Sequence, residues 1–173
     1  MNIDLLKNMI VDVPDFPREG IIFKDITPIL EDYHALDSMI HHMCESVDIK
    51  PNKLVAIESR GFLLGAAMAS KMHLGLVLAR KKGKLPGETY SEEFSLEYGT
   101  DQLEIHKSSL SPDDTVVIVD DVLATGGTAE AATKLCEQAG AKVISYSFLI
   151  ELGFLSGRQK LKGKGPIHSL IKY

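Results

Sequence analysis

An apolar run that ends in two acids and a loop rich in threonine and glycine is the strongest chemical signal in the chain. Val116–Val119 precedes Asp120 and Asp121, and the loop Ala124–Thr128 reads Ala-Thr-Gly-Gly-Thr. If a helix begins after the glycines, its first backbone N–H groups have no helical partner and can bind a phosphate. The threonines Thr125 and Thr128 add hydroxyl donors. The segment therefore predicts an anion site.

The two acids need a different partner from the loop. Asp120 and Asp121 would repel a phosphate, so neutral hydroxyls such as a ribose diol, or a metal ion, are their natural ligands. The loop lacks the lysine of an NTPase P-loop and the GxGxxG of a dinucleotide site. The alternative is an Asp-capped turn whose glycines only allow tight packing. Both acids together with both threonines favour a sugar phosphate.

Cations gather in two further segments. Glu58-Ser59-Arg60-Gly61 follows another apolar run, so free amides beside the Arg60 guanidinium predict a second anion site. Arg80, Lys81 and Lys84 lie close together and repel one another unless they are solvated or face a polyanion. Taken alone, this cluster would be interpreted as a solvated surface. If a diphosphate binds opposite it, the cluster is better interpreted as part of the binding site.

The elements that must position these residues alternate between strands and helices. Short apolar runs, several of them β-branched, are typical of buried strands, and they cover 54–57, 76–79, 115–119, 142–149 and 167–171. Alanine-rich segments predict helices over 61–72 and 128–139, with Gly140 at a helix end, and apolar periodicity predicts another over 33–47. The pattern predicts an α/β fold with a central, mostly parallel five-stranded sheet flanked by helices, and ligands at the carboxyl ends of the strands.

The segment Lys81–Asp101 breaks this alternation. It contains Lys-Lys-Gly-Lys, Pro-Gly and Tyr-Gly between residues that alternate as strands do, which predicts a projecting hairpin. Long excursions of this kind in compact domains are often lids over active sites. We expect a flexible lid.

Composition sets the outer bounds. A chain of 173 residues fits one domain, and a net charge of -5 argues against a general nucleic-acid or membrane surface. Cys44 and Cys136 are too few and too far apart for a disulfide framework or a zinc site, and the N-terminus lacks the pattern of a signal peptide. These features predict a cytoplasmic protein. The basic stretch Arg158–Lys164 is interpreted as solvated surface.

The segment Val116–Thr128 resembles the phosphoribosyl pyrophosphate loop of the type I phosphoribosyltransferases. The resemblance implies that the two acids contact the ribose hydroxyls and that the loop holds the 5′-phosphate, which assigns Asp120, Asp121, Ala124, Thr125, Gly126, Gly127 and Thr128. It assigns the pyrophosphate to Ser59, Arg60, Arg80, Lys81 and Lys84.

Three other stretches, Asp15–Pro28, Arg80–Gly87 and Ser95–Gly99, resemble adenine phosphoribosyltransferases. The resemblance implies that Phe23 stacks on the base, that the backbone beside it reads the base edge, and that a leucine closes the far side; the adenine residues are then Ile22, Phe23, Lys24 and Leu152. Lys24 departs from the arginine of the family pattern. Glu97 would be the catalytic acid or base, and Tyr98 a lid residue over the reactants.

The resemblance also implies the reaction and its partners. The 5-phosphoribosyl group of phosphoribosyl pyrophosphate would pass to N9 of adenine, giving AMP and pyrophosphate, with Mg²⁺ held mainly by substrate oxygens and water rather than by protein ligands. We expect one domain over 1–173 with an N-terminal hood at about 1–33 and the lid at about 81–103, and a homodimer. Two alternatives stay open: another acceptor base such as xanthine, hypoxanthine or orotate, and a non-catalytic regulator that senses nucleotides.

Overall fold

The computed structural model describes residues 1–95 and 99–173, which form two compact units, Met1–His42 and Met43–Tyr173. The first unit runs through α1 (Ile3–Met9), β1 (Val11–Pro14), β2 (Ile22–Asp25), α2 (Thr27–Glu31) and α3 (Tyr33–Glu45), the last of which continues across the boundary. Strands β1 and β2 form a two-stranded antiparallel sheet in which Val13 pairs with Phe23. The helix predicted over 33–47 is thus confirmed, ending two residues earlier.

The second unit is built on one seven-stranded sheet. Its elements are β3 (Lys53–Ile57), α4 (Arg60–Met72), β4 (Gly75–Lys81), β5 (Thr89–Ser95), β6 (Thr100–His106), β7 (Thr115–Leu123), α5 (Gly127–Gln138), β8 (Lys142–Glu151), the short 3-10 helices η1 (Gly153–Leu155) and η2 (Gly157–Leu161), and β9 (Ile167–Lys172). The strand order is β5-β6-β4-β3-β7-β8-β9.

The five predicted strands are confirmed as β4, β3, β7, β8 and β9, all parallel to one another. The sheet is wider than predicted because the hairpin joins it. Strand β6 pairs antiparallel with the end of β4, at Arg80 with Glu104 and Lys81 with Leu103. The predicted helices are α4 and α5, and Gly140 follows α5 with a φ of +81°, which glycine adopts most readily.

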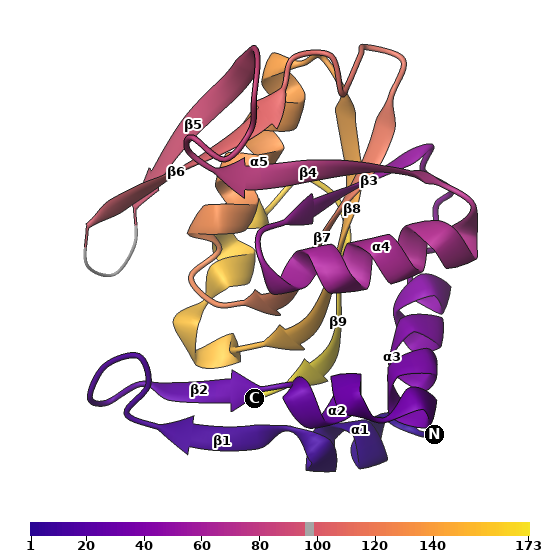
Figure 1. Ribbon diagram of the computed structural model, residues 1–173, viewed down its shortest axis with the longest axis vertical. Coiled ribbons are helices and arrows are strands. Elements are labelled where there is room, and N and C mark those ends of the chain that lie inside the picture. The colour runs from indigo at the N-terminus through magenta and orange to yellow at the C-terminus, as the bar shows by residue number, and fades with distance from the viewer. Residues whose placement is uncertain (96–98) are drawn as a thin grey trace. The chain divides into compact units, whose positions relative to one another are not determined.

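The order of the strands sets where a ligand can bind. From β3 the chain passes through α4 to β4 on one side, and later returns to β7 on the other side of β3. Figure 1 shows α4 and α5 on different sides of these strands, as right-handed crossovers in opposite directions require. The connections that follow β3 and β7 therefore lead away from each other. The crevice between them, at the carboxyl ends of these two strands, is the usual ligand site of such sheets.

The predicted hairpin is formed by β5 and β6, which pair from Thr89 with His106 to Ser95 with Thr100. Glu92 on β5 connects this hairpin to α5: Lys134 Nζ lies 3.0 Å from its carboxylate and Gln138 donates a hydrogen bond of 3.0 Å. The strands of the hairpin are therefore part of the packed second unit.

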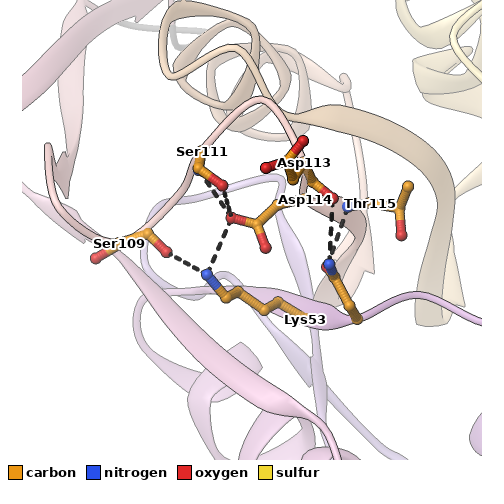
Figure 2. Close-up of polar contacts among 7 residues, drawn as sticks. Lys53, Ser109, Ser111, Asp113, Asp114 and Thr115 are labelled. Carbon is orange, nitrogen blue, oxygen red and sulfur yellow. Dashed lines mark hydrogen bonds and ion pairs between the residues drawn. The ribbon is translucent and has the colours of Figure 1, made fainter.

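At the amino ends of β3 and β7, far along both strands from that crevice, a polar cluster ties the two strands together (Figure 2). Asp114 Oδ2 accepts hydrogen bonds from Lys53 Nζ at 3.0 Å and from Ser111 N at 2.7 Å, and Lys53 also donates to the carbonyl of Ser109. Burial works to raise the pKa of the Asp114 carboxyl, but the hydrogen bonds from Lys53 and Ser111 outweigh it and hold the pKa below its ordinary value. Ionised Asp114 therefore stabilises the fold.

We expect Asp114→Asn to lower the free energy of unfolding at pH 7 by about 1–3 kcal/mol, because it leaves the Lys53 ammonium without its counter-ion. Since the pKa of Asp114 is lowered, this stabilisation is present above the ordinary aspartate value of about 4 and is lost as the pH falls through the folded-state pKa. Urea unfolding at pH 7 and at pH 3 measures the difference in free energy of unfolding between Asp114→Asn and the unaltered protein. This difference should be smaller at pH 3. The exposed neighbour Asp113→Asn is the control; equal stability of the two variants at pH 7 would contradict the prediction.

Two general features complete the fold. In the part of the chain that the structure describes, no helix has the length and apolar character needed to cross a bilayer. Cys44 and Cys136 are both free thiols.

Candidate functional site

A cavity of about 410 Å³ opens at the carboxyl ends of β3 and β7, where the topology predicts it. Three segments line it: the turn after β3, the end of β7 with the start of α5, and the hairpin. The described lining residues are Glu58, Ser59, Arg60, Lys81, Phe94, Asp101, Leu103, Asp120, Asp121 and Thr128. Six of them, Ser59, Arg60, Lys81, Asp120, Asp121 and Thr128, are among the residues predicted from the sequence.

The threonine- and glycine-rich loop forms a second, smaller hollow of about 50 Å³ beside the first. Its lining includes Ala124, Thr125, Gly126 and Thr128, and Thr128 and Asp120 border both spaces. Gly126 has a φ of +81° and caps α5, which begins at Gly127, so the first amides of α5 follow this hollow directly. The loop therefore borders a hollow where the sequence predicts an anion site, and the binding of an anion there stays a prediction.

The two acids of the motif differ in their surroundings. Asp120 is 9% exposed and accepts a hydrogen bond of 2.8 Å from the backbone N–H of Asp121. Burial, followed by the repulsion of Asp121, raises the pKa of the Asp120 carboxyl well above its ordinary value. Asp121 instead contacts the Arg60 guanidinium at 2.5 Å. The pair brings together the segments that follow β3 and β7.

Close packing holds these two segments in register. A Cβ atom at Gly61, the second residue of α4, would lie 2.8 Å from Asp120 Oδ1 and 3.1 Å from the carbonyl oxygen of Val119. Only glycine allows helix α4 to begin this close to β7. The position of Arg60 beside Asp121 therefore follows from the Arg-Gly dipeptide in the sequence.

Each cation at the end of β4 has an acidic partner. Arg80 donates to both carboxylate oxygens of Glu58, at 3.1 and 3.3 Å, and its guanidinium lies 5.8 Å from the centre of the Phe62 ring. The Arg80 hydrogen bonds are the main cause of the lowered pKa of Glu58. Lys81 Nζ lies 3.0 Å from Asp101 Oδ2 on the hairpin. A bound polyanion would compete with Asp101 for Lys81.

Arg80 and Lys84 are not among the described residues that line the cavity, although both were predicted to bind pyrophosphate. They lie beside it: Arg80 donates to the carbonyl of Lys84 at 3.2 Å, and the backbone N–H of Lys81 donates to Glu58 at 2.9 Å. Glu58 therefore fixes the backbone from which all three cations extend.

The residues predicted to bind the base lie in two parts of the chain. Ile22, Phe23 and Lys24 lie on β2 of the first unit, where Ile22 is 55% exposed and the Phe23 ring packs edge-on against Phe16, with centroids 5.2 Å apart. Lys24 Nζ lies 2.6 Å from Asp12 on β1. Leu152 follows β8 in the second unit, and its N–H donates to the carbonyl of Leu123.

Four lining residues were not predicted from the sequence, and two predicted residues lie outside the described part of the chain. Glu58, Phe94, Asp101 and Leu103 were not predicted; Glu58 directly precedes the predicted Ser59-Arg60, and the other three follow the strand alternation of the hairpin. Glu97 and Tyr98, the predicted catalytic pair, lie outside the described residues. Both stay predictions.

Comparison with known proteins identifies the family. The model of the phosphoribosyl transferase domain matches residues 24–165. An adenine phosphoribosyltransferase of Carboxydothermus hydrogenoformans is 54% identical over 169 residues, which cover 97% of this chain and 99% of the relative. The chain belongs to the adenine phosphoribosyltransferase family.

Solved structures of this family have the same fold. The adenine phosphoribosyltransferase of Thermoanaerobacter pseudethanolicus is 50% identical, with a TM-score of 0.97 over 99% of this chain and 100% of the other. That of Saccharomyces cerevisiae, complexed with adenine and an imino-altritol bisphosphate, is 40% identical with a TM-score of 0.91, covering 97% of each chain. The predicted type I phosphoribosyltransferase fold is confirmed.

Proposed function

We propose that this chain transfers the 5-phosphoribosyl group of phosphoribosyl pyrophosphate to N9 of adenine, giving AMP and pyrophosphate. The observation that supports this most directly is the joined pair of hollows: a small one made by the amide-rich loop, and a larger one bordered by four acids, Asp120 and Asp121 among them, and by the cations Arg60 and Lys81. The first suits a terminal phosphate, and the second suits a sugar that carries a diphosphate. The family to which the chain belongs supplies adenine as the acceptor.

In the proposed reaction, pyrophosphate leaves the anomeric carbon while positive charge builds on the ribose ring. The loop Ala124–Thr128 holds the 5′-phosphate and thereby fixes the ring, and Asp120 and Asp121 accept hydrogen bonds from its hydroxyls. Arg60 and Lys81 oppose the charge that develops on the leaving group, with Ser59 beside them. Arg80 and Lys84 extend this positive region from the end of β4.

The proposal gives recognition of the base to Phe23 with the backbone of Ile22 and Lys24, and a further apolar contact to Leu152. An amino-pyrimidine edge needs both a donor and an acceptor, which one stretch of backbone supplies without any special side chain. The ammonium group of Lys24 is paired with Asp12, so a lysine at this place is compatible with backbone recognition.

Glu97 is proposed as the group that manages the proton at N7 of the base, with Tyr98 packing over the reactants. The hairpin between about residues 81 and 103 would act as the lid that carries them, and about residues 1–33 as the hood over the base. Closing such a lid excludes water and raises the pKa of a carboxyl group beneath it, which suits proton transfer near neutral pH.

Magnesium fits the acids that the cavity offers. In the stretches 1–95 and 99–173, no group of three or more His, Cys, Asp or Glu side chains could hold a metal ion by itself. Mg²⁺ commonly uses one or two carboxylates together with substrate oxygens and water, and Asp120 and Asp121 both border the cavity. When bound, it would neutralise charge on the pyrophosphate. We also propose a homodimer in the cytoplasm, as the family resemblance and the composition suggest.

The proposal is tested by product analysis with phosphoribosyl pyrophosphate, magnesium and one base at a time. We expect AMP and pyrophosphate with adenine, and a kcat/KM at least about 100-fold lower with hypoxanthine, xanthine or orotate, because a base that offers a carbonyl where the site expects an amino group leaves polar groups unpaired. Equal use of hypoxanthine would contradict the base assignment alone. Binding of phosphoribosyl pyrophosphate without product from any base would support the non-catalytic alternative.

A further inference from the structure

The backbone of the phosphate-binding loop is in direct contact with a second backbone segment, at Gly157. A Cβ atom at Gly126 would lie 2.5 Å from the carbonyl oxygen of Gly157, and one at Gly157 would overlap the carbonyl oxygen of Ala124 and lie 3.0 Å from the amide nitrogen of Gly126. Real Cβ atoms do not approach so closely. The two segments therefore pass each other with no room for a methyl group on either.

Arg158, the next residue, fixes this second segment to the sheet. Its guanidinium donates to both carboxylate oxygens of Glu151, at 2.6 and 2.8 Å, and to the carbonyl of Ile167 on β9 at 3.0 Å. Glu151 ends β8 and is 7% exposed, and the Arg158 hydrogen bonds are the main cause of its lowered pKa. The Arg158 side chain is 39% exposed, and the interpretation of Arg158–Lys164 as solvated surface did not include the ion pair that Arg158 makes with the buried Glu151.

The rest of the segment is anchored as well. Leu161, the last residue of η2, is fully buried in the core. On the other side of Gly157, the N–H of Gly153 donates to the carbonyl of Tyr173, and the N–H of Leu152 donates to the carbonyl of Leu123 at the end of β7. Gly157 is thus held between two fixed points, one attached to β8 and β9 through Arg158 and the other to the end of β7 through Leu152.

A loop with two consecutive glycines needs such a support. Glycine leaves the backbone free to adopt many conformations, whereas phosphate binding requires several N–H groups to point at one spot. A rigid neighbour in van der Waals contact limits those conformations before the ligand arrives, which improves binding without touching the ligand. No residue of the segment 153–161 lines either hollow of the site among the described residues.

We propose that Gly157 and Arg158 are positioning residues for the 5′-phosphate: Gly157 supports the Ala124–Gly126 backbone, and the Arg158–Glu151 pair holds Gly157 in place. The inference rests on the proposed function, since it takes this loop to be the phosphate site. It predicts that substitutions at Gly157 or Arg158 weaken the binding of one class of ligand only. Ligands that carry a 5′-phosphate should lose affinity, while pyrophosphate, which would bind beside Arg60 and Lys81, should not.

The test is calorimetry on the full chain with ribose 5-phosphate and, separately, with inorganic pyrophosphate and magnesium. For Gly157→Ala we expect the Kd of ribose 5-phosphate to rise about 10-fold, and that of pyrophosphate to stay within about two-fold. Arg158→Lys keeps the charge but loses the planar fork, and should raise the ribose 5-phosphate Kd about three-fold in the same selective way. This second variant keeps the proposal testable if Gly157→Ala does not fold.

Gly165→Ala is the matched control. Its Cβ would also meet a backbone oxygen, that of Ile144 at 2.9 Å, but at the start of β8 rather than at the phosphate loop. It should lower the melting temperature and leave both Kd values unchanged. Equal weakening of both ligands by Gly157→Ala, or unchanged ribose 5-phosphate binding, would overturn the inference. If the unaltered protein bound neither ligand, the proposed function itself would fail.

Discussion

Replacing Arg60 by alanine is expected to lower kcat/KM for phosphoribosyl pyrophosphate by about 10²–10³-fold. The guanidinium borders the cavity and is one of the two described cations that do so. Removing one fixed donor that faces developing negative charge commonly has an effect of this size. The substitution also leaves Asp121, which is 7% exposed, without the cation 2.5 Å away, so an uncompensated carboxylate would face the incoming anion.

Steady-state kinetics with phosphoribosyl pyrophosphate varied at saturating adenine measures this loss. Arg60→Lys keeps the charge without the planar fork. Its kcat/KM should lie between those of Arg60→Ala and the unaltered protein, about 10-fold below the unaltered value. Lys107→Ala is the control, since Lys107 is an exposed cation paired at 3.5 Å with Glu88, away from the cavity. Activity of Arg60→Ala within about three-fold of the control would remove Arg60 from pyrophosphate binding.

The fold was predictable because its signals are local. Five buried strands appear as apolar runs, and the glycines that start and end the helices stand where the backbone needs them, as at Gly126 and Gly140. What the sequence did not indicate was the width of the sheet. Whether a hairpin projects or adds to a sheet edge depends on a few pairings with a distant strand, here Arg80 with Glu104 and Lys81 with Leu103.

In the candidate site, too, residues with local sequence signals were predicted and residues that depend on distant pairings were not. Residues in continuous motifs, such as Asp120, Asp121 and Thr128, were found because neighbours in sequence serve one ligand. Asp101 was missed because its relevance comes from its distance to Lys81, which only the hairpin pairing creates. The ion pair of Arg158 was missed for a similar reason: a basic run is usually solvated, and the partner Glu151 becomes recognisable only once the end of β8 lies beside Arg158.

The second large effect concerns the hairpin. Phe94 and Asp101 are paired across β5 and β6, and both border the cavity. Glu97, the proposed acid or base, lies between these two residues in the sequence and outside the described part of the chain. In the proposed mechanism it acts on the proton of the base and does not contribute to the binding of phosphoribosyl pyrophosphate.

We therefore expect Glu97→Gln to lower kcat by about 10²–10⁴-fold, the usual contribution of a positioned proton-transfer group, while the Kd of phosphoribosyl pyrophosphate stays within about two-fold. Single-turnover kinetics and calorimetry separate the two quantities. The control is Glu93→Gln, which removes the same charge from the same hairpin. Glu93 accepts a hydrogen bond of 3.2 Å from Gln102 and does not border the cavity. This variant should leave both kcat and the Kd of phosphoribosyl pyrophosphate unchanged. If Glu97→Gln turned over as fast as this control, the proton at N7 would have to move through solvent, and the hairpin would serve binding alone.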